Sequence, residues 1–126
     1  MFVCRKNSAR SKLAEGFGKA LGNGKIEVTS SGLESSTVRP EAIRTMKDVG
    51  IDISRQTSDA LADFSPEDFD AGISMCGCGV SLPEAWVQRE YFDDWDLEDP
   101  AERPEIFPKI RDEIKKRVSD LIEQLN

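Results

Sequence analysis

Apolar residues along this chain recur with two different periods, and segments of the two kinds alternate. Over residues 107–125 the apolar side chains recur every three or four residues, which predicts a long amphipathic helix. The same spacing predicts a helix from Arg10 to about Leu21 and another from Pro40 to Gly50. The apolar positions of these helices are Leu13, Phe17, Ala20, Leu21, Ala42, Ile43, Met46, Val49, Phe107, Ile110, Ile114, Val118, Leu121 and Leu125.

Shorter apolar stretches between these helices predict strands. Residues 58–64 and a Ser-Pro-Glu start at 65–67 favour short helices, whereas residues 76–83 favour a loop rich in Gly and Pro. The predicted strands are residues 1–3, 25–31, 70–75 and about 89–94.

Strands that alternate with helices are typical of a parallel sheet with helices on both faces. A length of 126 residues suffices for one hydrophobic core and is short for two. We therefore predict an α/β fold: a single domain over residues 1–126, with a central four-stranded parallel sheet flanked by helices on both faces.

Composition and charge narrow the function classes. No apolar run reaches the eighteen or so residues of a membrane-spanning helix, and the N-terminus lacks a secretory pattern, so we expect a cytoplasmic protein without a membrane partner. The net charge of −7 argues against nucleic acid as a partner. Residues 1–14 nevertheless carry four basic side chains and no acidic one, and residues 93–105 are strongly acidic, so a small anion would be drawn to the first segment. The four basic residues are Arg5, Lys6, Arg10 and Lys12.

The chain contains no histidine and three cysteines. The absence of histidine excludes Ser-His-Asp triads, Cys-His dyads and histidine-ligated metal sites. An odd number of unevenly spaced cysteines does not form the framework of a small secreted protein, so they are expected to be catalytic, redox-active or metal-binding.

Three reactive side chains follow predicted strands. Cys4 follows the first strand, Cys76 the third and Asp99 the fourth. In open parallel sheets, ligands bind at the carboxyl ends of the strands. These residues are therefore expected to meet at one edge of the sheet.

The segment between the first strand and the first helix is a candidate anion-binding loop. Its backbone N–H groups and the N-terminus of the helix can surround a tetrahedral oxyanion, and Arg10 can add a two-pronged contact. The same field favours the thiolate of Cys4, to which Ser11 could donate a hydrogen bond, and Asn7 tolerates a left-handed backbone. The predicted oxyanion-binding residues are Arg5, Lys6, Asn7, Ser8, Ala9, Arg10 and Ser11.

Cys4, Asn7, Arg10 and Ser11 have the spacing of the anion loop in low-molecular-weight tyrosine phosphatases, and the chain resembles that family. The resemblance implies the phosphatase-type anion loop after strand 1. It also implies that Asp99, which precedes Pro100, is the acid that protonates the leaving oxygen.

A second motif, Cys76-Gly77-Cys78-Gly79, has no use in phosphate hydrolysis. Here the chain resembles the arsenate reductases built on the phosphatase fold, in particular the branch recycled by glutathione and glutaredoxin. The resemblance spans essentially the whole chain, and it includes residues 29–32, 50–53 and 97–100.

The resemblance implies a mechanism in which arsenate binds in the loop and the Cys4 thiolate attacks arsenic. Asp99 donates a proton as oxygen leaves as water, and a second thiol then attacks the sulfur of Cys4, so that arsenite is released. The second thiol is Cys76, Cys78 or glutathione, and we expect both cysteines to relay electrons, in an order that the sequence leaves open. Neither a tightly bound cofactor nor a metal ion is expected. The expected reductant is glutathione, with glutaredoxin rather than thioredoxin as the partner protein.

Two other functions are compatible with these residues. A low-molecular-weight protein tyrosine phosphatase would hydrolyse an aryl phosphate without Cys76 and Cys78. A noncatalytic thiolate protein would bind arsenite or a soft metal through Cys4, Cys76 and Cys78 without turnover.

Overall fold

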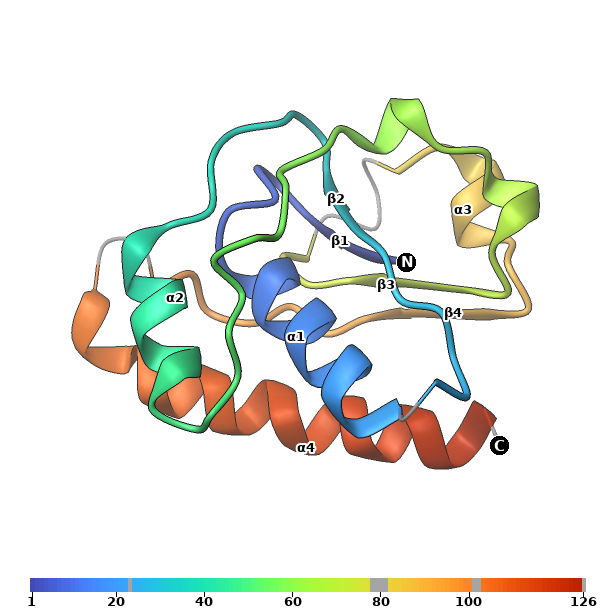
Figure 1. Ribbon diagram of the computed structural model, residues 1–126. Coiled ribbons are helices and arrows are strands. Elements are labelled where there is room, and N and C mark those ends of the chain that lie inside the picture. Colours follow the sequence, from blue (N-terminus) through green and yellow to red (C-terminus); the bar gives the residue numbers. More distant parts are fainter. Residues whose placement is uncertain (23, 78–81, 101–102, 126) are drawn as a thin grey trace.

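The computed structural model describes residues 1–22, 24–77, 82–100 and 103–125. Cys78, one of the predicted redox residues, lies outside these ranges. At the centre of the fold is helix α1 (Arg10–Gly22), whose Leu13, Ala14 and Phe17 are almost wholly buried. Helix α1 contacts the sheet and also packs along the long C-terminal helix α4 (Phe107–Leu125), its neighbour in Figure 1.

The sheet has four strands, and every neighbouring pair is parallel. The strands are β1 (Phe2–Cys4), β2 (Ser30–Gly32), β3 (Ala71–Ser74) and β4 (Tyr91–Asp94), in the order β2-β1-β3-β4. Strand β1 therefore lies inside the sheet, paired with β2 on one side and β3 on the other. The predicted four-stranded parallel sheet is confirmed.

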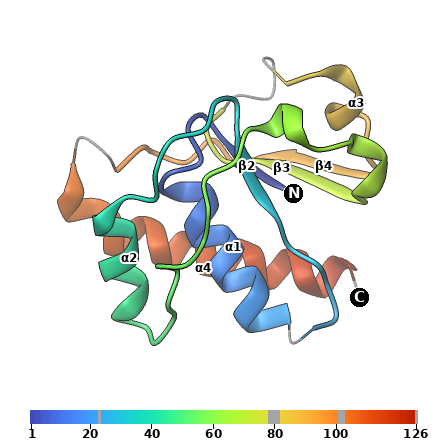
Figure 2. The ribbon, with the colours of Figure 1, turned by 45° about the horizontal axis from the view of Figure 1, so that its top comes forward.

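Helices cover both faces of this sheet, as predicted (Figure 2). One face packs against α1, α4 and helix α2 (Pro40–Lys47) and forms the larger apolar core. The other face is covered by helix α3 (Glu84–Val87) and two 3₁₀ turns, around a smaller core that contains Val3, Leu61 and Trp86. The two turns are Leu61–Asp63 and Pro66–Asp68, and a third turn, Pro104–Ile106, leads into α4.

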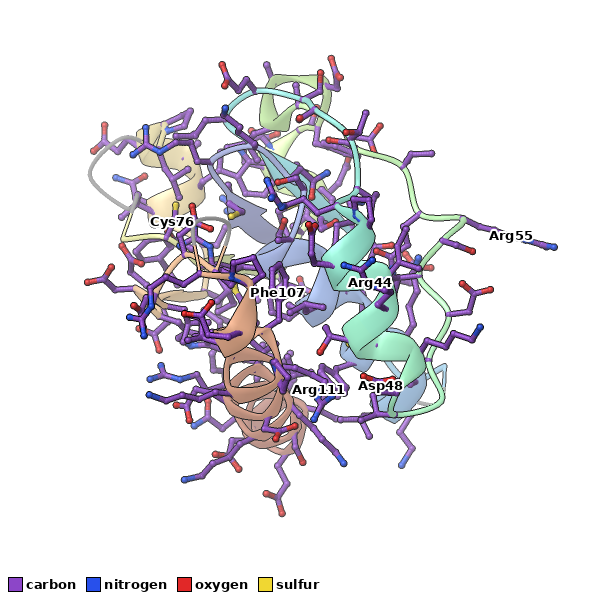
Figure 3. The ribbon with its side chains drawn as sticks, turned by 90° about the vertical axis from the view of Figure 1, so that its left-hand side faces the viewer. Arg44, Asp48, Arg55, Cys76, Phe107 and Arg111 are labelled. Carbon is purple, nitrogen blue, oxygen red and sulfur yellow. The ribbon has the colours of Figure 1, made fainter. Side chains whose placement is uncertain are left out.

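Helices α2 and α4 are tied together at their shared edge. Arg111 of α4 donates a hydrogen bond to the carbonyl oxygen of Thr45 in α2, at 3.2 Å. Figure 3 shows Arg111 between the two helices, with Phe107 near the start of α4.

Two predictions of local structure were wrong, and one short helix was missed. Strand β2 is confined to Ser30–Gly32, because Ile26 and Val28 pack over the glycines at the end of α1 and do not extend the ladder. The helix predicted over residues 58–64 is only the turn Leu61–Asp63. Helix α3 was not predicted, because a single turn has no room for helical periodicity.

None of the helices in the described part of the chain is long and apolar enough to cross a lipid bilayer.

Candidate active site

Cys4 lies at the carboxyl end of β1, directly before the loop that leads into α1. It is a free thiol and is buried. Residues 5–9 bend sharply, and α1 begins at Arg10 with its N-terminus toward the loop. Asn7 has a φ of 51°, the left-handed conformation that the sequence favours for Asn at this position.

The Asn7 side chain anchors the loop to two neighbouring segments through hydrogen bonds. It is completely buried, and its amide nitrogen donates to the carbonyl oxygens of Ser30 and Asp59, each at 3.4 Å. The Ser11 hydroxyl donates to Asn7 Oδ1 at 2.8 Å. Ser11 therefore supports the loop through Asn7 in this structure, and the expected bond from Ser11 to Cys4 is replaced by this one.

The segment after β2 holds the loop from its outer side. Leu33 N–H donates to Cys4 O at 3.0 Å, and Arg39 N–H donates to Ser8 O at 2.8 Å. A Cβ atom on Gly32 would lie 2.6 Å from the Asn7 nitrogen and 2.5 Å from the Glu34 carbonyl oxygen. Glycine is required at this position because the backbone of the loop passes directly against it.

Arg10 connects the loop to the two other predicted reactive segments. Its Nη1 donates to the carbonyl oxygens of Leu97, at 2.8 Å, and Met75, at 3.4 Å. Its Nη2 lies 3.7 Å from Asp99 Oδ2. These contacts place residues 75–76 and 97–99 beside the anion loop, as the rule for parallel sheets predicts.

The Nε atom of Arg10 is buried and has no hydrogen-bond partner among the described residues. A buried guanidinium donor without a partner costs about 1–3 kcal/mol. Since Arg10 itself is only 7% exposed, the Nε–H group fits a donor reserved for a bound oxyanion.

The predicted acid and the second thiol differ in their environments. The Asp99 side chain is 56% exposed, so it can exchange protons with solvent. Cys76, labelled in Figure 3, is half-buried and lies two residues after the end of β3. It is disulfide-bonded, whereas Cys4 is a free thiol. Among the described residues, the free thiol of Cys4 and the disulfide-bonded Cys76 thus lie near the same edge of the sheet.

Lys12 does not add to the positive charge of the loop, contrary to the interpretation of the basic N-terminal segment. Its side chain is 1% exposed, with Nζ 3.3 Å from Glu15 Oε1, and it donates a hydrogen bond to Thr57 O. Glu15 also pairs with Lys19 and accepts from the Ser30 hydroxyl. Burial lowers the pKa of the Lys12 ammonium, and the Glu15 carboxylate offsets part of this effect. Lys12 is therefore a structural cation behind the loop.

Sequence reasoning did not identify the groups that orient Arg10 and Asn7. The acceptors are backbone carbonyls of Met75, Leu97, Ser30 and Asp59, which leave no trace in residue type. Gly32 was detectable in principle, as a glycine directly at a strand end next to the predicted loop.

Comparison with known proteins adds the evolutionary context. The family model described as low molecular weight phosphotyrosine protein phosphatase matches residues 1–126. A protein of Synechocystis sp. named glutaredoxin arsenate reductase is 56% identical, over 100% of this chain and 97% of that relative. An arsenate reductase of Bacillus subtilis is 36% identical, over 97% of this chain and 93% of that relative.

Among solved structures, one described as an arsenate reductase in the phosphate binding state superposes with a TM-score of 0.94. It is 56% identical, and the match covers 100% of this chain and 97% of the other.

Proposed function

The chain belongs to the low molecular weight phosphotyrosine protein phosphatase family, and we propose that within this family it reduces arsenate to arsenite with electrons from glutathione and glutaredoxin. The observation that carries the proposal is the pairing of a free, buried Cys4 with a disulfide-bonded Cys76 in segments that Arg10 joins. A phosphatase needs the first cysteine and has no use for the second.

Arsenate, which has the tetrahedral shape and charge of phosphate, would bind to the backbone N–H groups of residues 5–11. Arg10 supplies its Nε–H, which has no partner in the described part of the chain, and the adjacent Nη2–H, two parallel donors on one edge of its guanidinium. Helix α1 begins at this point, and the partial positive charge at its N-terminus stabilises the bound anion.

The first covalent step forms a bond between Cys4 Sγ and arsenic, and one arsenate oxygen departs as water. Asp99 donates the proton that this oxygen needs, and its position 3.7 Å from Arg10 keeps it beside the bound anion. The product is a Cys4 thiolate ester of pentavalent arsenic.

The second step is the reduction. A thiolate attacks Cys4 Sγ, a disulfide forms, and the electron pair of the broken sulfur–arsenic bond remains on arsenic, which leaves as arsenite. We assign the attacking thiol and its resolving partner to Cys76, Cys78 and glutathione. Two further thiols, from glutathione or from glutaredoxin, then return the enzyme disulfide to its reduced form.

We also place the protein in the cytoplasm. The mechanism needs Cys4 as a thiol at the start of each cycle, and the glutathione pool of that compartment keeps thiols reduced.

Substitution of the downstream cysteines separates reduction from hydrolysis. In Cys76→Ser/Cys78→Ser we expect arsenate turnover to fall to background, with inorganic phosphate bound as in the wild type. Any hydrolysis of p-nitrophenyl phosphate should continue, because that reaction needs only Cys4, Arg10 and Asp99. Cys4→Ser is the control that should abolish both reactions. Arsenate reduction at the wild-type rate in the double variant contradicts the proposal.

A further inference from the structure

The turn that follows β3 is held by the end of the neighbouring strand β4. The Gly77 N–H donates to Asp94 Oδ1 at 3.0 Å, and the Asp96 N–H donates to the same oxygen at 3.2 Å. Asp94 is the last residue of β4, and Gly77 directly follows Cys76. Asp94 Oδ1 therefore links the turn that contains Cys76 to the segment that leads from β4 toward Asp99.

The backbone of this turn admits little variation. Gly77 has a φ of +70°, and a Cβ atom there would lie 2.5 Å from Asp96 Oδ1. Asp96 itself has a positive φ of 38°. Both residues are thus folded tightly around the Asp94 carboxylate, and this arrangement fixes where the Cys76 backbone emerges from the sheet.

The cysteine sulfur lies close to the same group of residues. Ser74 is paired with Asp94 in the β3–β4 ladder, and the buried Ser74 hydroxyl lies 3.9 Å from Cys76 Sγ. Asp94 is half-buried, so its charge is only partly screened by water.

We propose that Asp94 is a positioning residue for the second redox centre: through Gly77 it holds the Cys76 turn in the shape of the oxidised form, and it thereby makes the Cys76 disulfide harder to reduce. The inference deepens the proposed function, on which it rests, because it assigns a determinant of the electron relay.

Two physical effects of Asp94 act in the same direction. The hydrogen bond to a charged acceptor stabilises the turn in which Cys76 is oxidised. The negative charge disfavours a nearby thiolate, so the reduced form gains less from ionisation. In the exchange with glutathione, one protein disulfide and two glutathione thiols give two protein thiols and one glutathione disulfide. Both effects of Asp94 shift this equilibrium toward the protein disulfide.

The consequence for the reaction is a stronger electron donor. A dithiol whose disulfide is stable gives up its electrons readily to the Cys4–arsenic adduct. Loss of Asp94 should therefore lower kcat for arsenate reduction while KM for arsenate, which reports on the anion loop, stays near the wild-type value.

The decisive experiment is an exchange equilibrium measured without arsenate. In the Cys4→Ser background, only Cys76 and Cys78 remain. The protein is equilibrated in glutathione buffers of varied redox ratio, and the reduced fraction is measured by thiol alkylation and mass. We expect Asp94→Ala to shift the equilibrium constant about 10-fold toward the reduced form, which is about 30 mV for a two-electron couple. Asp94→Asn, which keeps an acceptor oxygen and loses the charge, should shift it about 3-fold in the same direction.

Asp93→Asn is the matched control. It removes the same charge one residue away, its side chain lies on the opposite face of the strand, and its oxygen can still accept from the Asp94 N–H. We expect this variant to leave the equilibrium constant unchanged.

The inference is overturned if the exchange constant of Asp94→Asn equals that of Asp93→Asn, or if either Asp94 variant shifts toward the disulfide. The Asp94→Asn comparison still decides the matter if Asp94→Ala does not fold. Because the exchange measurement contains no arsenate, its result can be interpreted even if the protein proves not to reduce arsenate. Conversely, an exchange constant that is unchanged in the Asp94 variants does not contradict arsenate reduction as the function.

Discussion

Arg10 is the residue on which the candidate site depends most. Its guanidinium contacts Met75 O and Leu97 O with one nitrogen and Asp99 with a second, and it keeps Nε–H without a partner in the described structure. A lysine carries the same charge on a single nitrogen, so it cannot present two parallel N–H donors to an anion while another nitrogen binds the carbonyls.

Arg10→Lys should therefore weaken the binding of inorganic phosphate, an arsenate analogue, by about 10- to 100-fold, or ~1.5–3 kcal/mol. Titration calorimetry measures this directly. Arg55→Lys is the control, because Arg55 is exposed and extends from the body of the molecule (Figure 3). Equal phosphate affinity in wild type and Arg10→Lys is the result that contradicts the assigned role.

The positions of Cys4, Arg10 and Asp99 were predictable from sequence, whereas the partners of Ser11 and Lys12 were not. The first three follow from strand ends and from a local spacing of six residues. The partner of Ser11 is Asn7, four residues earlier, and Lys12 lies beside Glu15 on α1. Lys12 also donates to Thr57 O, which only the packing of α1 against the chain before β3 brings within reach. A lysine within a basic segment gives no sign that it will be buried.

Lys12 gives a prediction about alkaline pH. Its pKa is lowered by burial, so between that value and about 10.4 the unfolded chain binds more protons than the folded one. Stability rises with pH wherever this holds, so the wild type should gain free energy of unfolding relative to Lys12→Met as pH rises toward about 10.4.

Urea unfolding at several pH values from about 7 to about 10 tests this, with exposed Lys25→Met as the control. For Lys25→Met, we expect the difference from wild type to change much less over the same range. A wild-type advantage over Lys12→Met that shrinks as pH rises is incompatible with a buried ammonium at this position.

At the scale of elements, β2 shows how a short edge strand supports the anion loop. Its three residues are Ser30, Ser31 and Gly32, none of which carries the apolar alternation by which strands are recognised. The apolar pair Ile26 and Val28, which misplaced the prediction, covers α1 instead. The helices with strong periodicity, by contrast, were predicted to within a few residues, because each presents one continuous apolar face.

Gly32→Ala should damage both this strand and the loop. The new methyl group would meet backbone atoms of residues 6, 7 and 34, which cannot move aside as a side chain tip can. We expect a loss of ~3 kcal/mol in the free energy of unfolding and at least a roughly 10-fold loss of phosphate affinity in the folded protein.

Gly50→Ala is the matched control, since Gly50 has a φ of +80° and a Cβ atom added there would meet nothing within 4 Å. It should cost only about 1 kcal/mol, from the left-handed backbone, and bind phosphate normally. Urea unfolding and calorimetry on both variants make the comparison. Phosphate binding by Gly32→Ala as tight as by Gly50→Ala would show that the loop does not depend on this close approach.

At the scale of the whole molecule, the parallel sheet brings together residues that are far apart in sequence. The segments after β1, β3 and β4 meet at one edge because parallel strands all end there, and Arg10 links the three. The acidic segment 93–99 lies at the same edge, and through Asp94 it contacts the redox turn. Among the described residues, the fold thus brings the proposed anion loop, the proposed acid Asp99 and the disulfide-bonded Cys76 to one edge of the sheet.

The most direct test of the account is arsenate-dependent NADPH oxidation by the purified protein. One assay contains glutathione, glutaredoxin and glutathione reductase, and a parallel one contains thioredoxin and thioredoxin reductase. We predict NADPH oxidation that depends on arsenate and on this protein with the glutathione and glutaredoxin system, and much slower oxidation with thioredoxin. No arsenate-dependent oxidation with either system contradicts arsenate reduction as the function of this chain.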